Sequence, residues 1–214
     1  MRKIVSISFF LLVAVFAICA QTATSNPQAK LIIDKALANM QRSPFKFEFT
    51  TIYIPGNQSE KQTQKGVLAL NGNKMYISLA GMETFFDGKT QWVYVAKNNE
   101  VSISEPTMQE LKELNPLLMI RDYGKSHRVV FDEVTEDGVW HLILYPTVAQ
   151  KVDYFRISLT IDKSTNLLKK IEFSQRNADK VIFSIQKQVL LEPTANLFTF
   201  DTSKHPHVEI NDLR

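Results

Sequence analysis

Few residues of this chain have types and spacing suited to catalysis or metal binding. Two of the four histidines, His127 and His141, fall in segments with the alternating pattern of strands, and none has helical metal-ligand spacing. His205 and His207 flank Pro206 and could chelate a metal weakly, although a solvated tail is the better interpretation. The histidines therefore predict no metal site.

The acidic residues and serines do not indicate an enzyme either. Glu133, Glu136 and Asp137 form an acidic cluster, but they flank Gly138 in a predicted turn, where solvated acids are common. Ser-x-x-Lys spacing occurs twice, once across Pro44 and once in a predicted strand, whereas a catalytic serine of that type opens a helix. We find neither a glycine-rich phosphate loop nor a Gly-x-Ser-x-Gly motif. We therefore expect a protein that is not an enzyme and uses no cofactor.

The first twenty residues have the pattern of a secretory signal peptide. A charged start precedes an apolar run from Ile4 to Ala17, and small residues at Cys19 and Ala20 provide a cleavage site. The run is shorter than the roughly 20 apolar residues of a membrane span. Ile18 stands where lipoprotein processing requires a small residue, which favours cleavage after Ala20 over lipidation of Cys19. We expect an exported, soluble protein whose mature part, residues 21–214, has no cysteine.

Length and charge predict one domain without a nucleic-acid partner. The 214-residue chain carries 25 basic and 22 acidic residues, a net charge of +3 that falls to +1 when Arg2 and Lys3 are removed. This balance gives no reason to expect nucleic-acid binding. The remaining residues are enough for a single core, and no repeat, linker or low-complexity segment divides them. We expect residues 21–214 to form one domain.

Residues 26–42 have the strongest helical period of the chain. Ser25 or Asn26 can cap the first turn, Pro27 suits a position where no amide hydrogen is needed, and Pro44 prevents continuation. These residues predict an amphipathic helix. Its apolar stripe consists of Ala29, Ile32, Ile33, Ala36, Leu37 and Met40.

After Pro44 the period changes to two, which indicates strands. Short turns such as Asn71-Gly72-Asn73 and Asp87-Gly88-Lys89 favour antiparallel hairpins. Together with one helix before them, the strands predict a mainly β (α+β) fold built on a strongly curved antiparallel sheet or partial barrel. The predicted strands are residues 45–53, 65–70, 74–79, 82–86, 90–96, 100–104, 127–134, 139–145, 153–162, 167–176 and 181–190.

The alternation breaks between Glu105 and Tyr123. Large apolar residues recur there at helical spacing, and Asn115-Pro116 predicts a split into two short helices. These residues are too many to bury against one another, so one side must lie on the sheet or over an opening in it. We expect this segment to act as a lid.

The apolar side chains exceed what a simple two-layer core requires. A packed core that buries the N-terminal helix explains them as well as a pocket does. Methionine and phenylalanine also form adaptable linings for flexible apolar ligands. The residues concerned are Phe45, Phe47, Phe49, Leu68, Leu70, Met75, Ile77, Met82, Phe85, Trp92, Tyr94, Leu117, Leu118 and Met119.

Three stretches resemble the bacterial outer-membrane lipoprotein carrier family, LolA. Residues Asp87 to Val95 are similar to a turn of that family that leads into an aromatic strand, and Asn115 to Ile120 is similar to the helical segment that follows. The ending, with Phe198 to Asp201 and Pro206 to Asp212, resembles the family's C-terminus, although His207 stands where glycine is common. The order and spacing of the stretches are more specific than any one of them.

The resemblance implies an unclosed β half-barrel covered by the N-terminal helix and a helical lid. It implies a periplasmic carrier, expected to be a monomer, that takes lipoprotein acyl chains from an inner-membrane releasing complex to an outer-membrane acceptor. The expected cavity residues are Phe47, Phe49, Leu68, Leu70, Met75, Ile77, Trp92 and Tyr94, and the expected lid residues are Leu117, Leu118 and Met119.

The sequence departs from the family at the hairpin after Leu70. Where the family commonly has an arginine that tethers the lid, this chain has Asn71-Gly72-Asn73, and Lys74 is the nearest cation. This departure bears on the lid-opening mechanism of the family. The alternative function is a lipid-sensing or lipoprotein-sensing module of the same architecture, without transport. An acyl-chain hydrolase would need a nucleophile and a base that meet in the cavity, and the sequence offers no recognisable pair.

Overall fold

The computed structural model describes residues 24–41, 44–57, 59–191 and 197–214, and the predicted signal peptide lies outside them. The described strands form one 12-stranded open sheet in the order β12-β6-β5-β4-β3-β2-β1-β11-β10-β9-β8-β7. Every pairing is antiparallel except that of β12 with β6. The strands are β1 Phe45–Ile54, β2 Gln62–Asn71, β3 Lys74–Leu79, β4 Met82–Phe86, β5 Gln91–Val95, β6 Glu100–Ser104, β7 His127–Phe131, β8 Val139–Pro146, β9 Tyr154–Asp162, β10 Leu168–Gln175, β11 Lys180–Leu190 and β12 Glu209–Asp212.

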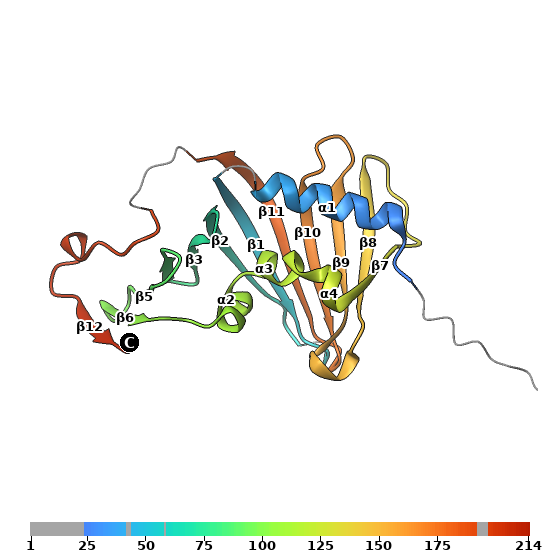
Figure 1. Cartoon of the computed structure of the whole chain (residues 1–214). Coiled ribbons are helices and arrows are strands. Elements are labelled where there is room, and N and C mark those ends of the chain that lie inside the picture. Colours follow the sequence, from blue (N-terminus) through green and yellow to red (C-terminus); the bar gives the residue numbers. More distant parts are fainter. Residues whose placement is uncertain (1–23, 42–43, 58, 192–196) are drawn as a thin grey trace, which may run out of the picture.

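The helices gather on one face of the curved sheet. Figure 1 shows α1 crossing β8 to β11, with α3 and α4 on the same face and α2 nearer the β3 side. This arrangement confirms the predicted α+β half-barrel. The helices are α1 Pro27–Gln41, α2 Met108–Leu114, α3 Pro116–Arg121 and α4 Tyr123–Ser126, and two 3-10 turns lie at Ala149–Lys151 and Thr202–Lys204.

The start of α1 is fixed to the edge strand β7. The Asn26 side chain accepts from the amides of Gln28 and Ala29 at 2.9 and 3.1 Å, so it satisfies two donors that a helix start leaves open. The backbone amide of Asn26 donates to the Val129 carbonyl, and the Val129 amide donates to Ser25 Oγ. These contacts hold the apolar stripe of α1 against the sheet.

The segment between β6 and β7, which holds α2, α3 and α4, is called the helical insert. It splits into α2 and α3 at the position that the sequence predicts. Thr107 caps α2 with a reciprocal capping box to Glu110, and Asn115 ends α2 and caps α3 by accepting from the Leu117 amide at 3.0 Å. Helix α4 was not predicted. Tyr123, at its start, donates to Asp34 of α1 at 2.7 Å, which ties the end of the insert to the N-terminal helix.

The concave face beneath α1 is a packed core. Ala29, Ile33 and Ala36 of the helix are at most 3% exposed. Because close-packed interiors leave few voids, this part of the half-barrel is already filled. The sheet side chains of this core that are at most 1% exposed include Leu142, Leu144, Ile157, Leu159, Ile161 and Ile171.

The C-terminal segment covers the opposite, convex face of β4 to β6. Phe200 packs against Phe85 and Tyr94, and the His205 ring contacts both Tyr94 and Phe200 at centroid distances of 4.3 and 4.5 Å. The expectation of a solvated tail is therefore wrong for His205, which packs against these rings, whereas Pro206 and His207 are exposed. The segment continues as β12.

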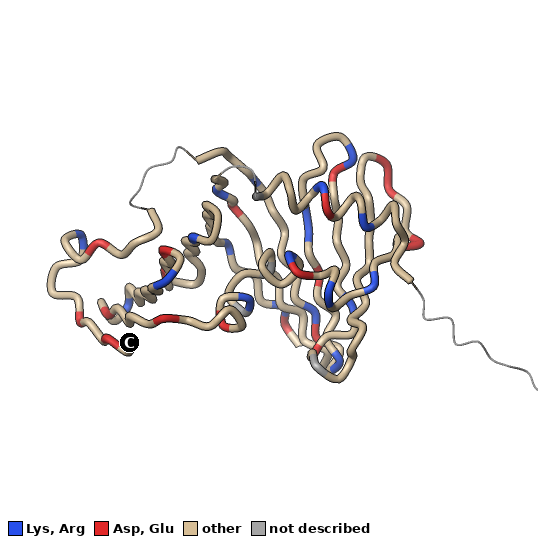
Figure 2. Tube along the Cα trace, viewed as in Figure 1, with Lys and Arg blue, Asp and Glu red and all other residues tan. Residues whose placement is uncertain are grey.

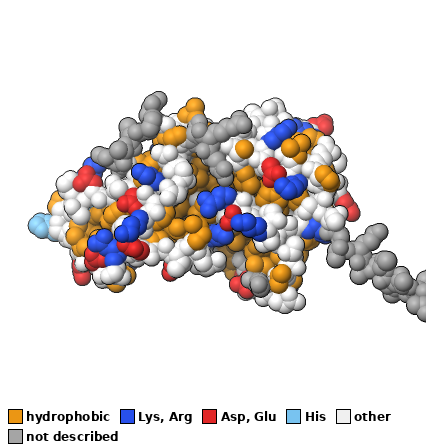
Figure 3. Space-filling model, in the orientation of Figure 1, with side chains coloured by type: hydrophobic (Ala, Val, Ile, Leu, Met, Phe, Trp, Pro, Cys, Tyr) orange, Lys and Arg blue, Asp and Glu red, His pale blue; other side chains and the backbone are white. Residues whose placement is uncertain are grey.

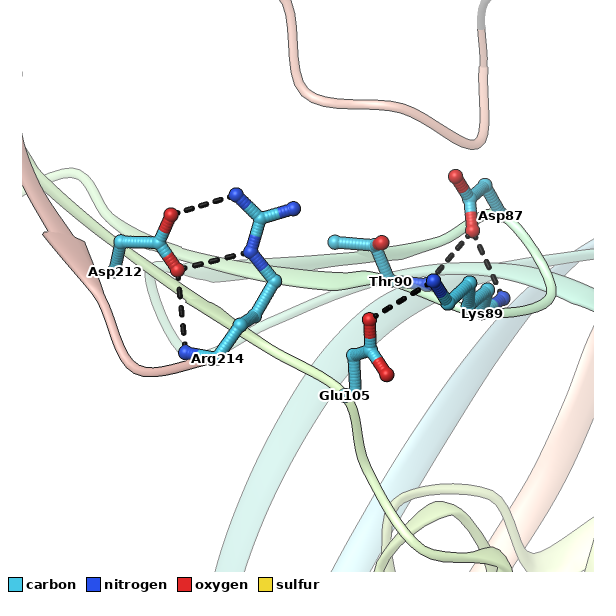
Figure 4. Close-up of polar contacts among 6 residues, drawn as sticks. All are labelled: Asp87, Lys89, Thr90, Glu105, Asp212 and Arg214. Atoms are coloured by element: carbon cyan, nitrogen blue, oxygen red, sulfur yellow. Dashed lines mark hydrogen bonds and ion pairs between the residues drawn. The ribbon is translucent and has the colours of Figure 1, made fainter.

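Ion pairs support this edge of the sheet (Figure 4). Asp212 binds the Arg214 guanidinium at 2.6 and 2.9 Å, and Lys89 reaches Glu105 at 3.2 Å, where β6 leads into the insert. Asp87 accepts from the amides of Lys89 and Thr90, which closes the turn between β4 and β5. Charges of both signs are interspersed over the sheet and helices (Figure 2), in agreement with the nearly balanced sequence.

Candidate functional site

A cavity of about 530 Å³ lies on the concave face beside the helical insert. Strands β1, β3, β10 and β11 form its floor, α2 and α3 border it from above, and the segment before β9 closes one side. Most of its lining is apolar, as expected for a ligand with little polarity. The lining residues are Phe49, Thr51, Ile77, Leu79, Gln109, Leu114, Met119, Val152, Asp153, Tyr154, Phe173, Gln175, Val181 and Phe183.

Aromatic rings make the floor rigid. Phe49 of β1 stacks on Phe183 of β11 with ring centroids 4.4 Å apart, and Tyr154 meets Phe173 edge to face at 5.8 Å. Gly66, opposite Phe49 on β2, leaves room for this ring, because an added Cβ would lie 2.5 Å from Phe49 Cζ. One ring contact thus joins β1 to β11, which are far apart in the sequence, and the other joins the neighbouring strands β9 and β10.

The rim combines exposed apolar residues with a few polar ones. Leu114 at the end of α2 is 39% exposed, and Met82, paired with Leu79 across the β3–β4 hairpin, is 47% exposed. In the space-filling view, hydrophobic side chains show at the surface in the middle of this face, where the insert crosses the sheet (Figure 3). An apolar ligand can thus reach the cavity along a partly apolar rim.

The structure brings only some of the predicted site residues to this cavity. Phe49 and Ile77 line its floor, and Met119 of the predicted lid borders it. Phe47, Leu68, Met75 and Leu117 are at most 5% exposed and belong to the packed core. Leu70 and Leu118, together with Met75, line a second cavity of about 70 Å³ between the insert and the β2–β3 hairpin.

Trp92 and Tyr94 lie on the other face of the sheet. The pairings Tyr76↔Phe85 and Phe85↔Trp92 put these three aromatic side chains together, whereas Ile77 pairs with Thr84 and then Val93. Directly opposed residues share a face, so Trp92 faces away from Ile77. The expectation that Trp92 and Tyr94 share the face of Met75 and Ile77 is therefore corrected, because it followed aromatic content and not the register through two hairpins.

Several lining residues were missed by sequence reasoning. Thr51 lies two residues after Phe49 on β1, and Leu79 lies two residues after Ile77 on β3. Since residues two apart share a strand face, the alternating pattern of the sequence could have identified both. The contributions of β10 and β11 were not visible, because they depend on the pairing of β1 with β11, more than 120 residues away in the chain. The missed residues of these two strands are Phe173, Gln175, Val181 and Phe183.

The small cavity lies where the lid-tethering arginine of the resembled family would be expected. Gly72 occupies the hairpin turn with a φ of +60°, and Lys74 and Arg121 both border the space. The Asn115 side chain is fully buried there, and its Nδ2 has no hydrogen-bond partner among the described residues. The structure thus places two cations and a buried amide between the hairpin and the insert.

A buried histidine supports one wall of the main cavity. His127 Nε2 lies 2.9 Å from the Tyr154 hydroxyl, and Nδ1 lies 2.8 Å from Ser126 Oγ. Burial lowers the pKa of His127 from its usual 6.5, because a charged imidazolium loses water there. Burial also raises the pKa of Tyr154. The folded wall therefore favours the neutral form of both side chains.

The stability of the fold is expected to fall as the pH drops from about 7.5 to about 5.5. In that range the unfolded chain binds a proton at His127 before the folded chain does, because the folded pKa is lower. His127→Gln should flatten this decline, measured as the free energy of urea unfolding at each pH. His207→Gln, at an exposed position, is the control. An equal decline in His127→Gln and the unsubstituted protein would contradict this assignment.

The described residues give no metal centre. Within residues 24–41, 44–57, 59–191 and 197–214, no group of three or more His, Cys, Asp or Glu is placed to hold a metal ion. Glu136 contacts His141 at 3.2 Å beside the Gly138 turn, as a partly solvated pair. In the same part of the chain, no helix is long and apolar enough to cross a membrane.

The chain matches one family model and resembles several solved structures. Residues 23–176 match the family model described as outer membrane lipoprotein carrier protein LolA. A comparison with curated proteins gives no match. Among solved structures, an uncharacterized conserved protein from Thermus thermophilus aligns with a TM-score of 0.58 at 11% identity, over 86% of this chain and 99% of that chain. A LolA superfamily protein from Nitrosomonas europaea aligns with a TM-score of 0.45 at 12% identity, over 81% of this chain and 98% of that chain.

Proposed function

We propose that this chain, which belongs to the outer membrane lipoprotein carrier family LolA, carries lipoproteins through the periplasm by sheltering acyl-chain carbon in its concave cavity. The observation that carries the proposal is the apolar cavity of about 530 Å³ beside α2 and α3. Phe49, Ile77 and Met119 contact the ligand, together with the lining residues Leu79, Leu114 and Phe183.

Burial of an acyl chain in the cavity supplies enough free energy to help it leave a membrane. Each methylene removed from water contributes about 0.8 kcal/mol, so a buried acyl chain offsets much of the cost of leaving a membrane. The aromatic floor supplies a ready surface for this burial, because its rings already hold one another in place. The ligand therefore needs little reorganisation of the sheet.

Loading and release depend on the helical insert. Helices α2 and α3 join at Asn115, whose cap bonds define the break between them, and Leu114 and Met119 on its two sides border the cavity. A small displacement of these helices changes the opening without breaking the strand pairing of the sheet. The carrier receives its cargo from a releasing complex of the inner membrane and gives it to an acceptor of the outer membrane.

A transfer assay separates carriage from sensing. Purified mature protein is incubated with inner-membrane vesicles that hold an acylated lipoprotein and the releasing complex, and the supernatant is then added to outer-membrane vesicles. We expect the lipoprotein in the supernatant as a complex with this protein and later in the outer-membrane vesicles. Binding without delivery would support a sensing module, and a lipoprotein that never leaves the first vesicles would contradict both functions.

A further inference from the structure

The size of the cavity limits how much of a lipid anchor it can hold. An engineered protein cavity of about 150 Å³ accommodates benzene, with its six carbons, which corresponds to about 25 Å³ per carbon. At that density the 530 Å³ of this cavity correspond to about 20 carbons. The space therefore matches one long acyl chain.

The surrounding core offers no second compartment of that size on the concave face of the described sheet. Beneath α1, Ile33, Leu142 and Ile171 are at most 1% exposed, so the sheet and the helix meet without an intervening space. The neighbouring cavity beside the β2–β3 hairpin measures only about 70 Å³. A third cavity, of about 560 Å³, is lined by Thr50, Lys65 and other residues on the convex face.

Resting on the proposed function, we infer that the cavity takes a single saturated acyl chain of up to about 20 carbons. Further chains of the same lipid anchor stay outside, against the rim formed by Leu79, Met82 and Leu114. These residues suit that place, because Leu79 lines the cavity and Met82 and Leu114 are substantially exposed beside it. The cavity therefore binds one acyl chain per protein, and further chains on the same lipid anchor add little to the affinity.

Synthetic peptides N-acylated with one saturated chain of about 8 to about 24 carbons test this inference. Affinity should rise by about fourfold per added methylene, the factor equivalent to 0.8 kcal/mol, and should stop rising near 20 carbons. Native mass spectrometry should find one peptide per protein at saturation. A second chain on the same peptide should raise affinity far less than the first.

Two neighbouring threonines of β1 give a matched pair of variants. Thr51 lines the cavity, whereas Thr50 faces the convex side. In Thr51→Phe, affinity should stop rising at a shorter chain length than in the unsubstituted protein. In Thr50→Phe, the chain length at which affinity stops rising should be unchanged. The series on the unsubstituted protein decides the question even if Thr51→Phe does not fold.

Three results would overturn the inference while leaving the proposed function intact. They are saturation by two or more single-chain peptides, affinity that keeps rising well past about 20 carbons, and a second chain worth as much as the first. A protein that binds no acylated peptide of any length would instead refute the proposed function, and the inference with it. The failures of the two proposals are thus distinguishable.

Discussion

Met119→Glu is expected to reduce affinity for an acylated ligand at least about hundredfold. Met119 of α3 borders the cavity, and a carboxylate there must lose water when an acyl chain enters. An unpaired charge beside buried hydrocarbon costs several kcal/mol, and about 3 kcal/mol corresponds to two decades of affinity. The measurement is titration with a fluorescent N-acylated peptide, together with extraction of lipid that co-purifies with each variant.

Met108→Glu provides the matched control for this experiment. Met108 is the first residue of α2, is 51% exposed and does not border the main cavity. A glutamate in the first turn also suits the helix dipole, so this variant should fold and bind as the unsubstituted protein does. Equal loss of binding in both variants, or unchanged binding in Met119→Glu, would place the ligand elsewhere.

Phe47→Ala is expected to lower the free energy of unfolding by about 3 to 5 kcal/mol. The Phe47 side chain has no exposed surface and belongs to the packed core, so its removal leaves a void that the surroundings fill only partly. Leu79→Ala should cost only about 1 kcal/mol, because Leu79 is half-buried and already borders open space. Urea unfolding followed by circular dichroism measures both values.

Phe47→Ala should lose more stability than Leu79→Ala, but Leu79→Ala should lose more affinity for the acylated ligand. Leu79→Ala removes a lining side chain and should weaken acyl binding, whereas folded Phe47→Ala should retain most of it under conditions that favour the native state. A Leu79→Ala variant that loses more stability than Phe47→Ala would contradict the division between core and cavity. That division decides which of the aromatic residues belong to the functional site.

Much of the architecture was predictable because its determinants are local. Asn26, Pro27 and Pro44 mark the limits of α1, and the break at Asn115 follows from the proline after it. Strand alternation and glycine turns located the hairpins to within a few residues, although β2 starts at Gln62, three residues before its expected start. These features depend on neighbours in the sequence.

The features that the sequence did not predict correctly depend on contacts between distant segments. The face of Trp92 is set by register through two hairpins, and β12 forms because Phe200 and the residues after it find an apolar surface on β4 to β6. Neither can be read from alternation alone, since a change of one residue reverses a strand's faces. Phe47 and Phe49 illustrate the same limit at the site, because both are buried in one core cluster and only Phe49 also lines the cavity.

The most direct test of the carrier proposal is photo-crosslinking with an acyl chain that carries a diazirine near its end. The chain is attached to a lipoprotein, the complex with this protein is irradiated, and the modified residues are identified by mass spectrometry. The proposal predicts modification of cavity residues such as Phe49, Ile77, Met119 and Phe183. Modification confined to the convex surface around Trp92 and Phe200, or none in a stable complex, would contradict it.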